Sequence, residues 1–173
     1  MDVFEAIKNR RSVRAYTSEE VSEEDVRRLI EAARWAPSAG NIQPWQFVIV
    51  RSTETKRRLS DAALHQTFIE KAPVAIVVCA DVERSSWGYG SRGANLYCLQ
   101  DTAAAIENIL LAAQALDLAT CWVGAFHEDA VARVLNTPRN ARPVAIVSVG
   151  HSAEKPRAPQ RRSLREIVHY ENF

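Results

Sequence analysis

The sequence lacks the residue patterns that build disulfide scaffolds, metal centres and serine hydrolase sites. Its three cysteines, Cys79, Cys98 and Cys121, are odd in number, lie in apolar segments and form no C-x-x-C pair. We therefore expect reduced thiols in a core rather than a disulfide framework. The four histidines are scattered without the spacing of metal ligands, which argues against a metal site. No G-x-S-x-G motif is present, so the signature of a nucleophile elbow is missing.

The sequence also lacks an excess of charge of either sign and any long hydrophobic run. The formal net charge is +1, so no global field would attract nucleic acid or an anionic membrane, and any basic site must be local. Glu or Gln interrupts the longest apolar tracts, which excludes a transmembrane span of about 20 apolar residues. We expect a soluble, cytoplasmic protein without nucleic-acid or membrane partners.

Length and composition predict one ordinary globular domain over residues 1–173. The chain is 47% hydrophobic and 25% charged, and it contains no internal repeat. The last segment, about 153–173, is basic and Pro-rich at first and then apolar. This composition favours a C-terminal arm that docks on another surface.

Hydrophobic periodicity predicts alternating helices and strands. We expect helices at about 2–9, 53–64, 94–116 and 128–135. A further helix is expected to begin at the N-cap Ser22 and to end before Pro37. Strands are expected at 46–50, 74–80, 119–123 and 144–149. The element order is that of an α/β chain and leaves the direction of the sheet open. The helix at 94–116 is apolar around most of its circumference, so we expect it to be central or packed against a partner subunit.

A polar loop, Ala36-Pro37-Ser38-Ala39-Gly40-Asn41-Ile42-Gln43-Pro44-Trp45, separates a helix from a strand. It places two carboxamides, Asn41 and Gln43, between two prolines that restrict the backbone. A carboxamide both donates and accepts hydrogen bonds, which suits a heterocycle with alternating donors and acceptors, such as the pyrimidine edge of a flavin. The alternative is an ordinary turn in which Trp45 anchors the following strand.

A cationic segment, Arg10-Arg11-Ser12-Val13-Arg14, follows the first predicted helix. Guanidinium groups hold phosphate oxygens through charge-assisted, bidentate hydrogen bonds. The alternative is that the cations complement the dipole at the end of that helix. Taken with the carboxamide loop, the segment indicates a ligand with a planar polar head and an anionic tail.

Two glycine positions have competing interpretations. Gly124 follows the predicted strand 119–123, where a small residue would let a ligand ring approach the backbone N–H groups, or it forms a simple strand-to-helix turn. Gly88–Gly93 matches G-x-G-x-x-G, but it neither follows a strand directly nor has an acidic partner about twenty residues later. We expect a mobile loop over a pocket there, with a Rossmann-type enzyme as the alternative.

The order of four motifs resembles the FMN-dependent nitroreductase family over essentially the whole chain. They are the cationic segment, the carboxamide loop, Cys121-Trp122-Val123-Gly124-Ala125-Phe126, and Arg161-Arg162-Ser163-Leu164 near the C-terminus. The resemblance implies an α+β fold with a central, mostly antiparallel or mixed sheet flanked by helices, in an intertwined homodimer. The helix at 94–116 would lie at the dimer core. The chain departs from the family at Asp117, where glycine is common.

The resemblance also implies which residues bind FMN. Arg10 and Ser12 would face the phosphate and ribityl, and Arg14 the N1/O2 edge of the ring. Pro37, Ser38 and Asn41 would come from the partner subunit, in a loop that Gln43 orders. The implied cofactor-binding residues are Arg10, Arg11, Ser12, Arg14, Pro37, Ser38, Ala39, Asn41, Gln43, Val123, Gly124, Ala125 and Arg161.

Two further implications concern the ends of the cofactor. The backbone at Val123, Gly124 and Ala125 would face N5 and O4, and Arg161 would close on the phosphate, with Lys155 and Arg157 as competitors for that role. The implied activity is the reduction of nitroaromatics, quinones or free flavin by NADH or NADPH, in a ping-pong hydride transfer. No side chain is expected to be catalytic, because the flavin carries the chemistry and Arg14 and Gly124 tune it. Alternatives are reductive dehalogenation or flavin fragmentation in the same fold, and a non-catalytic flavin-binding dimer.

Overall fold

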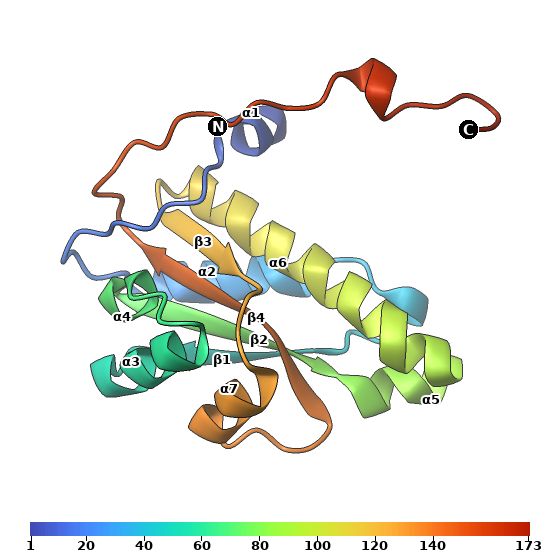
Figure 1. The fold of residues 1–173 in the computed structure, drawn as a ribbon, viewed down its shortest axis with the longest axis horizontal. Coiled ribbons are helices and arrows are strands. Elements are labelled where there is room, and N and C mark those ends of the chain that lie inside the picture. The colour runs from blue at the N-terminus through green and yellow to red at the C-terminus, as the bar shows by residue number, and fades with distance from the viewer.

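A computed structural model describes all residues, 1–173, and contains one four-stranded sheet (Figure 1). The strands are β1 (Trp45–Val50), β2 (Val74–Asp81), β3 (Ala119–Val123) and β4 (Ala141–Gly150). Their order is β1-β2-β4-β3, and every neighbouring pair is antiparallel, which settles the direction that the sequence left open. The expected α+β fold is confirmed, although β4 begins three residues earlier than its apolar run at 144–149.

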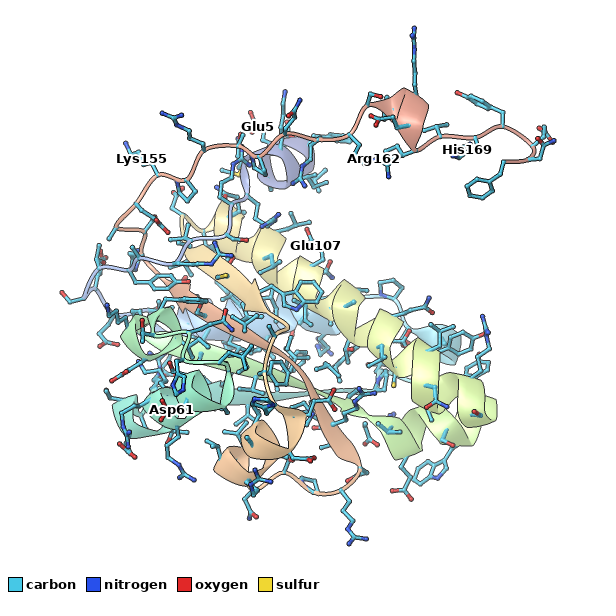
Figure 2. All side chains as sticks on the ribbon, viewed as in Figure 1. Glu5, Asp61, Glu107, Lys155, Arg162 and His169 are labelled. Atoms are coloured by element: carbon cyan, nitrogen blue, oxygen red, sulfur yellow. The ribbon has the colours of Figure 1, made fainter.

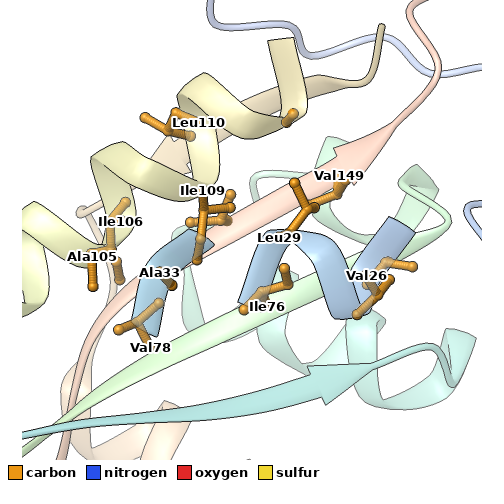
Figure 3. Packing of buried hydrophobic residues seen from close by; sticks show 14 of the residues in the cluster. Val26, Leu29, Ala33, Ile76, Val78, Ala105, Ile106, Ile109, Leu110 and Val149 are labelled. Atoms are coloured by element: carbon orange, nitrogen blue, oxygen red, sulfur yellow. The ribbon is translucent and has the colours of Figure 1, made fainter. Parts of the chain in front are cut away.

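Helices cover both faces of this sheet. On one face lie α2 (Glu23–Arg34) and α6 (Cys98–Ala115), and on the other lie α3 (Thr53–Ala62), α4 (Phe68–Lys71) and α7 (Glu128–Leu135). β2 is buried on both faces because its side chains alternate between two hydrophobic clusters: Ile76 and Val78 face α2 and α6, as Figure 3 shows, while Val77 faces the other layer.

Local signals set the ends of several helices. Asp2 and Glu5 form a capping box at the start of α1 (Val3–Asn9), and the predicted N-cap Ser22 accepts a bond from the Asp25 N–H at 3.0 Å. Asp117, which follows α6, adopts φ +57°. Asp117 therefore makes the left-handed turn into β3, at the position where the resemblance led us to expect glycine.

The predicted mobile loop at Gly88–Gly93 is wrong. The first five of these residues belong to α5 (Val82–Arg92), which bends at Gly90 (φ +54°), and Gly93 begins a π-helical turn, Gly93–Tyr97, that continues into α6. Gly93 permits this packing, because a Cβ there would lie 2.1 Å from the Ser85 carbonyl oxygen. The Rossmann alternative is also wrong, since β2 has only antiparallel neighbours and no parallel βαβ unit exists.

The C-terminal arm, residues 153–173, leaves β4 and bonds to the body of its own chain at Ala153 and Glu154. From residue 157 on it is exposed and extends past α1 (Figure 1). Its only regular element is one 3₁₀ turn, Leu164–Glu166. Apolar side chains along the arm are exposed, namely Leu164, Ile167, Val168, Tyr170 and Phe173, and so are Val3, Phe4 and Ile7 of α1. No helix in the structure has the length and apolarity needed to cross a membrane.

Candidate functional site

The cationic segment continues from α1 as an extended strip along the edge strand β3. Ser12 pairs with Thr120 in a parallel bridge, and the Val13 N–H donates to the Thr120 carbonyl oxygen at 2.9 Å. On the other side, Glu154 Oε1 accepts from the N–H groups of Arg14, at 2.5 Å, and Ala15, at 3.1 Å. The segment is therefore fixed through its backbone, which leaves its polar side chains available.

Extended backbone sends alternate side chains to opposite sides, and this divides the segment. Burial raises the pKa of the Cys121 thiol, and Arg14, Ser12 and Arg10 lie close enough to oppose that shift. Arg11 is directed elsewhere: its Nη1 donates to the carbonyl oxygens of Lys8 and Arg10, both at 2.8 Å, at the end of α1. The alternation therefore assigns Arg10, Ser12 and Arg14 to one side of the segment, and Arg11 serves as a helix cap of the kind that the alternative interpretation described.

The cations of this group have few ionic partners. Arg14 makes no salt bridge, and its guanidinium carbon lies 5.8 Å from the centre of the Phe68 ring. Arg10 Nε is 4.0 Å from Glu107 Oε1, the outer limit for an ion pair. The guanidinium groups of Arg14 and Arg10 are therefore not held in close ion pairs, although the Glu154 carboxylate lies at the backbone of the same segment.

The end of β3 adds an open stretch of backbone beside these cations. Gly124 is exposed, and a Cβ built on it would meet no atom within 4 Å. The Gln66 side-chain amide donates to the carbonyl oxygen of Ala125 at 3.0 Å and to that of Ala63 at 2.9 Å. Sequence reasoning missed Gln66, which lies between α3 and α4, and Phe68, which begins α4, because neither a motif nor a periodic pattern marks them.

Tyr16 ties the same segment to the sheet. Its hydroxyl donates to the Val13 carbonyl oxygen at 2.6 Å and lies 2.7 Å from Ser148 Oγ. Burial raises the pKa of Tyr16 well above its usual range, so the phenol stays neutral and keeps its proton for this bond.

The carboxamide loop folds largely on itself. Ser38 Oγ accepts from the Gln43 N–H at 3.0 Å, and the Gln43 amide nitrogen donates to Asn41 Oδ1 at 3.2 Å. Gly40, Asn41 and Gln43 have φ values of +56°, +55° and +55°. The two predicted carboxamides therefore contact each other, and Asn41 remains exposed.

Besides the bond from the Ala36 N–H to the Ala33 carbonyl oxygen of α2, three hydrogen bonds link this loop to the rest of the chain. The Ala39 N–H donates to Asp101 Oδ1 of α6 at 3.1 Å. Arg84 Nε donates to the Ile42 carbonyl oxygen at 2.6 Å, and the Asp81 N–H donates to the Pro44 carbonyl oxygen, also at 2.6 Å. Asp101 is the only buried side chain among these three anchors.

Within one chain the two halves of the predicted site lie apart. Figure 1 shows the cationic segment at the upper left, beside α1 and β3, and the carboxamide loop at the right, beside the start of α6. The arm does not join them: Figure 2 shows Lys155 near α1 and Arg162, the neighbour of Arg161, farther out along the arm. Lys155 instead lines a cavity of about 300 Å³ together with Arg11 and Asp117.

Comparison with known proteins identifies relatives along nearly the whole chain. The sequence profile described as "Nitroreductase family" matches residues 7–68 and 62–151. The chain is 36% identical over 158 residues to an Archaeoglobus fulgidus protein whose name includes NAD(P)H nitroreductase, covering 89% of this chain and 87% of the relative. It is 30% identical to the Bacillus subtilis "FMN reductase (NADPH)", covering 99% of this chain and 74% of the relative.

Solved structures agree with the sequence comparison. The structure of B. megaterium NfrA2 superposes with a TM-score of 0.92 at 27% identity, covering all of this chain and 76% of that one. A nitroreductase family protein from Streptococcus pneumoniae gives a TM-score of 0.89 at 25% identity, covering 98% of this chain and 100% of that one. The resemblance drawn from four short motifs is confirmed, and this chain belongs to the nitroreductase family.

Proposed function

We propose that this chain is an NAD(P)H-dependent oxidoreductase that holds FMN in a site made by two copies of the chain. Family membership supports the class of reaction, and relatives named FMN reductase, NADPH-flavin oxidoreductase and NAD(P)H nitroreductase support the cofactor and the electron donor. Its acceptor would be a nitroaromatic, a quinone or a related small molecule.

The observation that carries the proposal is the grouping of Arg10, Ser12 and Arg14 beside the open backbone at Gly124. An anionic phosphate suits guanidinium groups with little competition from carboxylates: Arg14 has no ion-pair partner, and Arg10 has only Glu107, at 4.0 Å. A flat ring suits a glycine whose Cβ position faces free space and which stands at the end of a strand. The residues present therefore fit FMN, with its charged tail and planar head.

Each of these groups has a distinct task in the proposed site. Arg10 and Ser12 would bind the phosphate and ribityl, and Arg14 would place a positive charge at the N1/O2 edge of the ring. Backbone N–H groups at Gly124 and Ala125 would face the N5 side. When bound, FMN supplies the hydride transfer between NAD(P)H and the acceptor, and the protein orients the reactants and sets the charge around them.

The second copy is needed because one chain keeps its two half-sites apart. In the proposed homodimer, Pro37, Ser38 and Asn41 of one copy complete the site that Arg10, Ser12 and Arg14 of the other copy begin.

We propose that residues 1–173 form one domain whose arm, 153–173, docks on the partner, because its exposed Leu164, Ile167 and Tyr170 need apolar cover. Arg161, with Lys155 and Arg157 as competitors, would then reach the phosphate. A cytoplasmic setting would keep the three buried cysteines reduced.

The visible spectrum of the purified protein tests the proposal. A flavin spectrum that bleaches under anaerobic NADH or NADPH, in a protein that sediments as a dimer, is the expected result. A yellow protein that neither donor bleaches would instead be a non-catalytic flavin-binding dimer, and product analysis would separate dehalogenation or flavin fragmentation from nitro reduction. A colourless protein that refuses added FMN, or one that stays monomeric, contradicts the proposal.

A further inference from the structure

Asp101 is a buried acid on α6 whose only hydrogen bond reaches the carboxamide loop. Its side chain is 7% exposed, and Oδ1 accepts from the Ala39 N–H at 3.1 Å. Oδ2 is buried, and no protein group bonds to it. Burial raises the pKa of Asp101 while the Ala39 bond lowers it, and no charged side chain contributes to that pKa. A carboxyl buried with so little compensation destabilises the fold, so packing alone does not account for its presence.

The loop enters from α2 at Ala36, which is buried in the core and donates to the Ala33 carbonyl oxygen at 3.0 Å. From Pro37 to Asn41 the bond to Asp101 is the only hydrogen bond to the body of the protein, because the Asn41 N–H donates to Ser38 and the Ile42 N–H donates to Ala39, both within the loop. The outside bonds from Arg84 and Asp81 hold its second half, at Ile42 and Pro44. Ala39 also lies directly before Gly40, where the positive φ values begin. Asp101 therefore sets where the turn that presents Asn41 starts.

We infer that Asp101 is a positioning residue for the half-site that receives the flavin ring. This inference rests on the proposed function: if FMN binds where we propose, the bond from Asp101 to Ala39 fixes the loop that recognises the ring, while the cationic segment recognises the phosphate. Asp101 acts through Ala39 and does not itself contact the ligand. Loss of the bond weakens binding of every ligand that carries the isoalloxazine ring, with or without a phosphate.

The test is a flavin titration of the apoprotein with FMN and with riboflavin, which lacks the phosphate. Asp101→Leu keeps a side chain of similar size and removes the acceptor. We expect it to weaken both ligands by the same factor, about tenfold or more, which is the range for one charge-assisted hydrogen bond. Asp101→Asn retains an oxygen that can accept from Ala39, so it should restore most of the affinity.

A second variant removes the same bond from the other partner. Ala39→Pro deletes the N–H at the first residue of the 3₁₀ turn, a position where proline is tolerated, and Ser38 already has the extended backbone (φ −144°, ψ 152°) that precedes proline. Asp101→Leu and Ala39→Pro combined should weaken binding no more than either change alone, because both delete one interaction. Should Asp101→Leu fail to fold, Ala39→Pro carries the test, since it leaves α6 intact.

Asn108→Leu is the matched control. Asn108 also lies on α6 and donates to a backbone oxygen, that of Ala32 in α2, at 2.9 Å. Its loss should lower the thermal unfolding temperature and leave both flavin affinities unchanged. Asp101→Leu and Ala39→Pro variants that bind flavins like the wild type, or whose effects add in the double variant, overturn the inference. Wild-type protein that binds no flavin contradicts the proposed function instead.

Discussion

The cationic segment and the carboxamide loop are held in the fold by different means. The cationic segment lies between β3 and the start of the arm: Val13 bonds to the backbone of Thr120, the following residues Ala15 and Thr17 bond to the backbone at 153 and 151, respectively, and the Glu154 carboxylate accepts from Arg14 and Ala15. The carboxamide loop bonds mostly within itself, and from Pro37 to Asn41 its only hydrogen bond to the body of the protein is the one to the Asp101 carboxylate.

This difference indicates how each half-site responds to change. Three backbone-to-backbone bonds, at Val13, Ala15 and Thr17, remain whichever single side chain is replaced, Glu154 included, so the cationic segment should keep its shape in most variants. The loop depends on single side chains and on three residues with positive φ, so one substitution can displace it. The cationic half should therefore report on ligand charge, and the loop half on ligand shape and position.

The largest expected effect comes from separating the two half-sites onto different copies. A variant carrying Arg10→Ala and Arg14→Ala, and another carrying Ser38→Ala and Asn41→Ala, should each lose most FMN as homodimers. A heterodimer of the two, purified through two tags, contains one site with both halves intact. It should bind roughly half the FMN of the wild type, as measured by flavin absorbance per dimer.

A site built within one chain predicts the opposite for this heterodimer. Each copy would then carry one defective half, and no intact site could form. A heterodimer without FMN would therefore contradict the two-copy site, while the wild-type heterodimer, tagged in the same way, provides the reference stoichiometry.

Arg14→Ala should have the next largest effect, on the cofactor's reduction potential. Removing the positive charge near the ring disfavours the negative charge that reduction brings. We expect the midpoint potential to fall by about 30 mV, the equivalent of about 1.4 kcal/mol for two electrons, and reduction by NADH to slow. Arg14→Lys keeps the charge, so its midpoint potential should lie between those of the wild type and Arg14→Ala. An unchanged potential in Arg14→Ala would place that guanidinium away from the ring.

Sequence predicted the elements well where one physical signal dominated. The β-branched run in β2 and the N-cap at Ser22 were correct because burial and capping are local properties of those residues. Gly88–Gly93 was mispredicted as a loop because its glycines suggested turns. In the structure these glycines are part of a bent helix: Gly93 packs closely against the Ser85 carbonyl oxygen, and Gly90 adopts the positive φ at the bend.

The candidate site was predictable only as separate pieces. Arg10, Ser12 and Arg14 carry chemistry that sequence can detect, but the exclusion of Arg11 from their group follows from its contact with the end of α1. Gln66 and Asp101 were missed because their roles come from tertiary bonds to Ala125 and Ala39, 59 and 62 residues away along the chain. No local pattern encodes such pairs.

Gly124→Ala sharpens the contrast by separating binding from stability. Gly124 lacks a positive φ and a Cβ there meets nothing, so the free energy of unfolding of the apoprotein should change by less than about 0.5 kcal/mol. FMN affinity should still fall several-fold, because the methyl group occupies the space proposed for the ring.

Gly40→Ala in the loop is the matched comparison for Gly124→Ala. Its φ of +56° and a Cβ position 2.7 Å from the Tyr89 hydroxyl predict a loss of about 1–2 kcal/mol in stability. For both variants, chemical denaturation measures the free energy of unfolding and flavin titration measures the FMN affinity. Equal stability losses at the two glycines would contradict the open space at Gly124.

Tyr16→Phe should have the smallest effect on FMN binding. The change removes the hydroxyl that bonds to the Val13 carbonyl oxygen and to Ser148 Oγ, so urea denaturation should show a loss of about 1 kcal/mol. FMN affinity should change by less than about twofold, because the bonds from Val13 to Thr120 and from Arg14 to Glu154 still hold the segment. A tenfold loss of affinity in Tyr16→Phe, as large as that expected for Asp101→Leu, would mean that the cationic segment also depends on one side chain and that the two half-sites are anchored alike.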